Sequence, residues 1–183
     1  MENGASSYHR FLAGDDEGLH DIICEYRTGL ILYLNSFVQN IHTAEELTED
    51  TFAELAINCP KYSGKSSFMT WLYAIGRNIT IKYLRKHAKL SIVPLESQKN
   101  LADEKNIESN YIKSEQKRIV HKALHSLKSE YRQVLYLSFF EEFSNTETAI
   151  IMKKNKRQIE TLLYNAKLAL KSELERSGFE YEE

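Results

Sequence analysis

The side chains best suited to chemistry lie in residues 66–89, where cationic and aromatic residues occur together. With the flanking Lys65, this segment carries six Lys or Arg residues and no Asp or Glu. Cations neutralise phosphates, and aromatic rings offer stacking surfaces for bases that have left a duplex. The segment therefore predicts a nucleic-acid contact. Its aromatic members are Phe68, Trp71, Tyr73 and Tyr83, and its cations are Lys65, Arg77, Lys82, Arg85, Lys86 and Lys89.

An acidic segment lies immediately before the basic one. Residues 41–60 contain five Asp or Glu residues and no Lys or Arg, so the formal net charge of −2 conceals two neighbouring segments of opposite sign. An acidic helix face is most often simply solvated. Beside a nucleic-acid-binding segment, the simplest interpretation assigns one helix to a protein partner and the next to DNA.

The composition predicts an all-α protein. The chain has only seven Gly and two Pro, and its apolar residues recur at spacings of three and four. This periodicity is interrupted over residues 91–113, a polar stretch that contains Pro94, and it resumes on both sides. We therefore expect two small helical domains, residues 1–90 and 114–183, joined by a flexible linker at 91–113, with a helix-turn-helix in the C-terminal domain.

The N-terminal domain is expected to contain three helices. A long helix spans about residues 17–40, with its apolar residues on one stripe. A second helix starts at Thr43, which forms a capping-box pattern with Glu46, and ends near Asn58. The third helix is expected to be capped by Ser66 or Ser67 and to bury Phe68, Leu72, Ile75 and Ile79.

The C-terminal domain ends in a helix-turn-helix pattern. Ser144 and Glu147 form a capping box that opens a short helix, and Asn155 can cap a longer one after a short gap. Ala149 is small enough to let the two helices approach. Ile159, Leu162, Leu163 and Ala166 form the inner face of the second helix, so the residues that point outward are Lys156, Arg157, Glu160, Thr161 and Tyr164.

Other kinds of chemistry find no support in the sequence. Cys24 and Cys59 lie far apart, which indicates reduced thiols, and no His or Cys set has the spacing of a metal site. We find no Gly-rich phosphate loop and no hydrolase motif, so we expect no catalytic residue, metal or cofactor. The N-terminus lacks the pattern of a signal peptide and no stretch has the length of a membrane span, so we expect a cytoplasmic protein.

Three segments together resemble a known family, the bacterial RNA polymerase sigma factors of the compact extracytoplasmic-function (ECF) group. TAEELTEDTFAEL resembles the acidic helix of the family's second conserved region. KYSGKSSFMTWLYAIGRNITIKYLRKH resembles its promoter-melting and minus-ten segment, and LHSLKSEYRQVLYLSFFEEFSNTETA resembles the fourth region leading into its helix-turn-helix. The resemblance implies a non-enzymatic sigma factor that binds core RNA polymerase, directs it to specific promoters and promotes DNA melting.

The resemblance also implies where the first domain binds. Glu46, Glu49 and Asp50 would face the coiled helices of the polymerase's largest subunit, where charge complementarity orients docking. The polymerase flap is a further expected contact. The loop before the basic helix is expected to hold a flipped base of the minus-ten element, and its residues are Tyr62, Ser63, Gly64, Lys65 and Ser66.

On the basic helix itself, Trp71 either stacks on an unpaired base or belongs to the core, and the residues leave both alternatives open. Arg77 and Asn78 would touch neighbouring nucleotides or the DNA backbone. The remaining minus-ten candidates are expected to grip upstream duplex phosphates, and they are Lys82, Arg85 and Lys86.

The helix-turn-helix would read the minus-thirty-five element. Its turn departs from the family pattern, because Lys153 and Lys154 stand where a glycine and an apolar residue are common, and base preferences do not transfer. Glu160 either accepts a hydrogen bond from a cytosine amino group or pairs with a neighbouring cation one turn away. The candidate contacts are Lys153, Lys154, Asn155, Lys156, Arg157, Glu160, Thr161 and Tyr164.

Two other function classes are weighed against a sigma factor. The first is a DNA-binding regulator that uses only its helix-turn-helix and senses a ligand with its N-terminal domain. The adjacent acidic and basic segments argue against it. The second is a helical enzyme, which the lack of catalytic motifs disfavours. The sequence leaves open whether an anti-sigma factor binds the chain.

Overall fold

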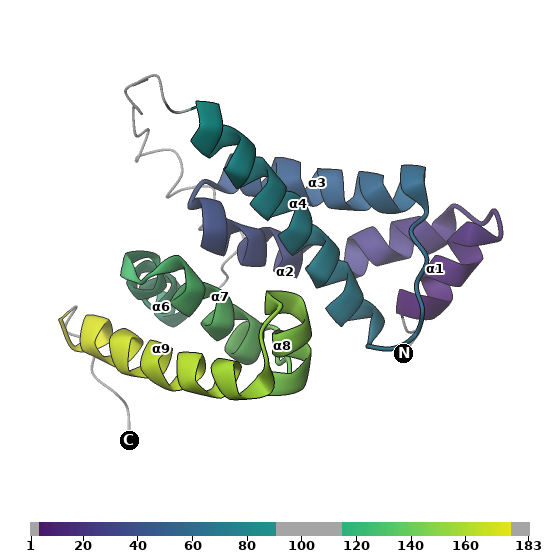
Figure 1. Cartoon of the computed structure of the whole chain (residues 1–183). Helices are drawn as coiled ribbons and strands as arrows, with labels where there is room; N and C mark the ends of the chain where they lie inside the picture. The colour runs from purple at the N-terminus through teal and green to yellow at the C-terminus, as the bar shows by residue number, and fades with distance from the viewer. Residues whose placement is uncertain (1–3, 91–114, 177–183) are drawn as a thin grey trace.

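The computed structural model describes residues 4–90 and 115–176, and all regular structure in those ranges is helical (Figure 1). This confirms the predicted all-α class. The predicted linker at 91–113 lies outside the described residues. The elements are α1 (Gly4–Leu12), α2 (Glu17–Val38), α3 (Ile41–Asn58), α4 (Phe68–Leu90), α6 (Glu115–Ser126), α7 (Ser129–Leu135), the π-helical turn η1 (Tyr136–Phe140), α8 (Asn145–Met152) and α9 (Lys156–Arg176).

Helix α2 is the centre of the N-terminal half. It packs against α1, α3 and α4 (Figure 1). The predicted apolar stripe forms its inner side, where Ile22, Leu30 and Leu34 are fully buried. Burial of such side chains typically contributes about 1.5–3 kcal/mol each to folding. The expected long N-terminal helix is therefore confirmed.

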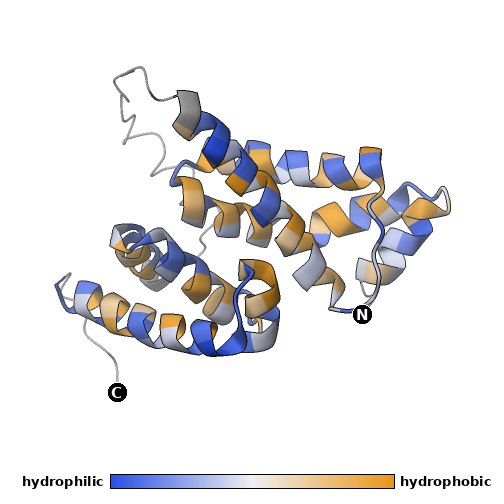
Figure 2. Ribbon diagram, in the orientation of Figure 1, coloured by the Kyte–Doolittle hydropathy of each residue, from blue (hydrophilic) through white to orange (hydrophobic). Residues whose placement is uncertain are grey.

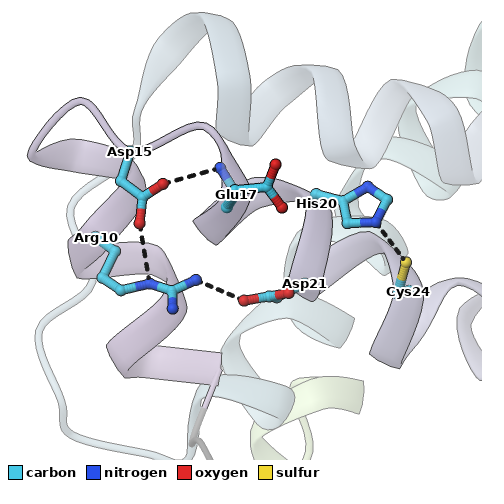
Figure 3. A network of polar contacts seen from close by, with 6 residues as sticks. All are labelled: Arg10, Asp15, Glu17, His20, Asp21 and Cys24. Atoms are coloured by element: carbon cyan, nitrogen blue, oxygen red, sulfur yellow. Dashed lines mark hydrogen bonds and ion pairs between the residues drawn. The ribbon is translucent and has the colours of Figure 1, made fainter.

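Helix α1 lies before the first helix that the sequence predicted. Its Tyr8 is fully buried and donates a hydrogen bond from its hydroxyl to the carbonyl oxygen of Pro60 at 2.8 Å. At Gly18, where α1 meets α2, an added Cβ would lie 2.2 Å from the Ser7 carbonyl oxygen, so only glycine permits this approach. Arg10 completes the junction through ion pairs with Asp15 and Asp21 (Figure 3). Helix α1 thereby ties the N-terminus to the loop that precedes α4.

The start of α3 differs from the prediction. The cap is Asn40, whose side-chain oxygen accepts a hydrogen bond from the Thr43 backbone N–H at 2.8 Å, and the helix begins at Ile41. The predicted Thr43 cap is wrong, because Gln39 turns the chain in a left-handed conformation and leaves Asn40 extended, the backbone that a capping residue requires. At α4, the cap is Ser67, whose Oγ accepts from the Thr70 N–H at 3.2 Å.

The C-terminal half contains the predicted helix-turn-helix. Ser144 and Glu147 form the expected capping box at the start of α8. Asn155 accepts from the Gln158 N–H at 2.8 Å, while the Gln158 side chain accepts from the Asn155 N–H at 2.9 Å. Ala149 is buried where α8 approaches its neighbours. The start of α9 and the turn before it are strongly hydrophilic (Figure 2).

The two halves lie against each other (Figure 1). Helix α8 packs on α4, and α7 and η1 pack on α2. Elements far apart in the sequence therefore form one interface between the two halves. Within the described ranges, none of the helices is long and apolar enough to cross a membrane.

Candidate nucleic-acid interface

The cationic end of α4 forms one wall of a cleft of about 770 Å³. The other wall comes from the end of α8 and the turn that follows it, so the cleft brings together cations predicted for the minus-ten and minus-thirty-five contacts. No acidic residue lines it. The cleft can therefore accommodate an anionic backbone. Its lining residues are Arg77, Asn78, Ile81, Lys82, Arg85, Lys86, Met152, Lys153 and Lys154.

The loop before α4 has a defined conformation. Tyr62 donates a hydrogen bond from its hydroxyl to the Ser66 carbonyl oxygen at 2.6 Å and so closes the loop on itself. Gly64 adopts a left-handed backbone with φ of +70°, which favours glycine. Ser63, Gly64 and Lys65 are exposed. These three of the five candidate base-binding residues are thus presented to solvent on a closed turn, while Tyr62 and Ser66 are half-buried.

Trp71 lies in an aromatic cluster directly behind this loop. Its ring centroid is 5.3 Å from that of Tyr8, 5.2 Å from that of Tyr62 and 5.4 Å from that of Phe68. Such tilted ring pairs add about 0.5–1.5 kcal/mol each beyond the area they bury. The indole is half-buried, and it supports the loop from behind through Tyr62. The geometry therefore favours packing as the main role of Trp71.

The outward face of α9 agrees with the helical spacing. Ile159 and Ala166 are fully buried, whereas Tyr164 retains 65% of its surface exposed. Among the described residues, no ion pair joins Glu160 to Lys156 or Arg157. The Glu160 carboxylate is thus oriented to solvent. The exposed candidates on this helix and at its cap are Asn155, Lys156, Arg157, Glu160, Thr161 and Tyr164.

The two lysines of the turn have different surroundings. Lys153 is exposed and adopts a left-handed backbone with φ of +54°, at the C-terminal end of α8 where such a conformation is common. Lys154 is more enclosed, and its Nζ lies 3.0 Å from Oε1 of Glu130 in α7. The sequence treated these two residues alike. The ion pair partly neutralises Lys154 and leaves Lys153 as the more available cation.

The acidic face of α3 points away from the core. Leu47 and Leu55 are buried on the inner side of the helix, and the three predicted docking carboxylates are exposed on the other. Within the described ranges no ion pair engages them, unlike Glu45, which lies 3.9 Å from Arg27. They therefore form an uncompensated anionic surface. Its members are Glu46, Glu49 and Asp50.

One further surface escaped the sequence analysis. An apolar hollow of about 350 Å³ lies between α6, η1 and α9, beside the exposed Phe139. The consecutive aromatic residues of the LSFF stretch were its only sequence signal. It is lined by Val120, Leu124, Leu135, Phe139, Phe140, Lys167, Leu170, Lys171 and Leu174. Among the described residues, no cluster of His, Cys, Asp and Glu is arranged to hold a metal ion.

Comparison with known proteins decides the family. The model for Sigma-70 region 2 matches residues 22–90, and the model for Sigma-70 region 4 matches residues 117–170. RNA polymerase sigma factor YlaC of Bacillus subtilis is 28% identical over 166 residues, which cover 88% of this chain and 94% of that protein. The ECF RNA polymerase sigma factor SigW of the same organism is 24% identical over 88% of this chain and 91% of that protein. The chain belongs to the ECF sigma factors.

This ECF sigma factor shares its fold with solved relatives. Sigma factor RpoE, in its structure with the anti-sigma factor NepR from Bartonella quintana, superposes with a TM-score of 0.65 at 20% identity, over 85% of this chain and 97% of that chain. Family membership fixes the general function: the protein directs RNA polymerase to promoters. The α1–α4 half contains region 2, and the α6–α9 half contains region 4.

Proposed function

We propose that this sigma factor divides promoter recognition between three surfaces described above. The exposed carboxylates of α3 dock on the coiled helices of the polymerase's largest subunit. The loop 62–66 captures an unpaired minus-ten base in front of the Trp71 cluster, and the α4 cations hold upstream phosphates. The outward face of α9 reads the minus-thirty-five duplex. In this arrangement the protein supplies specificity and strand capture in the cytoplasm and performs no bond chemistry itself.

The observation that carries this proposal is the geometry of α9. Its buried side is anchored by Ile159 and Ala166, so the exposed Arg157 and Glu160 are available to base edges. The N-terminus of α9, capped by Asn155, carries backbone amides and the positive end of the helix dipole, which suit it to bind phosphates. A recognition helix that enters the major groove has this arrangement.

Two protein contacts extend the proposal. The apolar hollow beside Phe139 suits an apolar segment of the polymerase flap, since its lining offers hydrophobic contact with Lys167 and Lys171 at its border. An anti-sigma factor is a further proposed partner, supported by the structure of the similar RpoE with NepR. Neither contact alters the assignment of α9.

Promoter-library selection with reconstituted holoenzyme tests the assignment. Arg157→Ala and Glu160→Ala should each change preference at one or two minus-thirty-five positions, at about 1–3 kcal/mol per position. Arg176→Ala serves as the control, because Arg176 lies on the same helix, is exposed and pairs with Glu173 away from the capped end. Unchanged preferences in both variants, with normal folding, would show that this face does not read the groove.

A further inference from the structure

The contact between the two halves contains a half-buried carboxylate, Glu141, and we call its binding position on region 2 the Glu141 seat. Glu141, which follows η1, accepts a hydrogen bond on Oε2 from the Tyr73 hydroxyl of α4 at 2.6 Å. Phe143 packs edge-on against the same tyrosine, with ring centroids 5.1 Å apart. Burial raises the pKa of the Glu141 carboxyl, and the Tyr73 hydrogen bond acts in the opposite direction. The region 4 half thus inserts a polar group and a ring into the surface of region 2.

Gly29 of α2 makes this seat possible. A Cβ added at Gly29 would lie 2.6 Å and 2.7 Å from the two Glu141 carboxylate oxygens and 2.5 Å from the Tyr73 hydroxyl. A side chain larger than hydrogen therefore cannot share the seat with the carboxylate without a shift of one of the groups. Glycine inside a helix is normally destabilising relative to alanine. Its presence in the middle of α2 is explained by the approach of Glu141.

A second polar contact joins α8 to the start of α4. Oε2 of Glu147 closes the α8 capping box with Ser144, while Oε1 accepts hydrogen bonds from the hydroxyls of Ser67 at 3.1 Å and Thr70 at 3.3 Å. The hydrogen bond from the Ser144 hydroxyl is the main cause that lowers the pKa of Glu147, and those from Ser67 and Thr70 add to it. One carboxylate therefore caps its own helix and binds the cap of a helix in the other half.

A third contact is buried between α7 and α2. The Nε of Arg132 donates a hydrogen bond to the Ser36 carbonyl oxygen at 2.8 Å, and Arg132 is only 5% exposed. The same guanidinium donates to the carbonyl oxygens of His125 and Leu127 within its own half. Together the three contacts fix one relative placement of the halves.

This placement cannot serve a promoter. The minus-ten and minus-thirty-five elements are about 25 base pairs apart, which is roughly 85 Å along B-form DNA at 3.4 Å per base pair. In the structure, the cations proposed for the two elements line a single cleft. Both elements of one promoter can be contacted only after α8 has separated from α4.

From these contacts we propose that the structure is a closed, self-inhibited form of the sigma factor. The Glu141 seat at Gly29 and Tyr73, with the Glu147 contact, holds region 4 on region 2, and binding to both elements of one promoter requires their release. The inference rests on the proposed placement of the two promoter contacts for its functional meaning, whereas the closed form itself is measurable without DNA.

The test is pulsed electron–electron double resonance on the full chain, which measures the distance between two spin labels. The labels are attached at Ala53→Cys on α3 and Ser172→Cys on α9, both exposed positions. The exposed native thiols are removed by Cys24→Ser and Cys59→Ser. The parent should give one narrow distance peak. Addition of core polymerase together with promoter DNA should replace it with a longer distance.

Two variants are designed to disrupt the Glu141 seat, one in each half of the protein. Gly29→Ala fills it from region 2, and Glu141→Arg places an unmatched cation in it from region 4. Both should lose the narrow peak while keeping their helicity by circular dichroism. Glu142→Arg is the matched control, because it makes the same charge change at the adjacent exposed position and should keep the peak.

A broad distribution in the parent, or a narrow peak retained by a folded Glu141→Arg variant, would overturn the closed form. Failure of the promoter selection with a narrow parent peak would instead count against the α9 assignment alone. If Gly29→Ala loses helicity, Glu141→Arg still decides the question, because its side chain belongs to the other half.

Discussion

Replacement of Trp71 distinguishes a packing role from a base-stacking role. Truncation of a fully buried Trp to Ala typically costs about 3–5 kcal/mol. Trp71 is half-buried and contacts three rings, so we expect Trp71→Ala to lower the free energy of unfolding by about 2–3 kcal/mol. With a urea dependence of about 1–3 kcal/mol per molar, the midpoint of urea unfolding should fall by about 1 M. Circular dichroism is the suitable probe, because the chain contains only one Trp.

The functional arm of this experiment uses a single-stranded minus-ten oligonucleotide bound by holoenzyme. Trp71→Phe keeps a ring in the cluster and should retain both stability and oligonucleotide binding, whereas Trp71→Ala should weaken binding through disorder of the loop held by Tyr62. Tyr164→Ala, at a 65% exposed ring, is the stability control. A Trp71→Ala variant with unchanged urea midpoint and lost oligonucleotide binding would refute the packing argument and establish the indole as a stacking surface.

Two charge predictions concern the other surfaces. Lys153→Ala should weaken binding to all promoters nearly equally and reduce the slope of log affinity against log salt concentration by about 0.9. Lys154→Ala should change this slope less, because Lys154 is already paired with Glu130. Equal slopes for the two variants in a salt titration would contradict the distinction. The double variant Glu49→Lys and Asp50→Lys should weaken core polymerase binding most at low salt, where charge attraction is least screened. Glu142→Lys is the control for this double variant. If the double variant binds core polymerase as well as the parent at all salt concentrations, α3 is not part of the docking surface.

The sequence predicted those features that depend on residues three or four apart. The Ser144 and Glu147 capping box and the Asn155 cap were predicted correctly, since each is a hydrogen-bonding pattern contained within one helical turn. The same logic failed at Thr43, because α3 is capped by Asn40 instead. The choice of Asn40 depended on the left-handed Gln39 that closes α2, and the backbone conformation of Gln39 could not be read from side-chain spacing.

Contacts between segments far apart in the sequence could not be predicted from sequence patterns. Helix α1 is short, and its role depends on the Tyr8 hydroxyl reaching the Pro60 carbonyl oxygen. Gly29 lies inside a long helix, where glycine is normally unfavourable, and its nearness to Glu141 explains its presence there. The candidate site shows the same division. Exposure along α9 followed from helical period, whereas the cleft shared by α4 and α8 required the tertiary structure.

The closed form balances attraction against repulsion. Six cations line the cleft between α4 and α8, and their mutual repulsion opposes closure most strongly at low salt. The hydrogen bonds of Glu141 and Glu147 hold the halves together against this repulsion, and each carboxylate makes only a few of them, of a kind typically worth about 0.5–1.5 kcal/mol net. A contact of this modest strength allows region 4 to leave region 2 when polymerase and promoter are present.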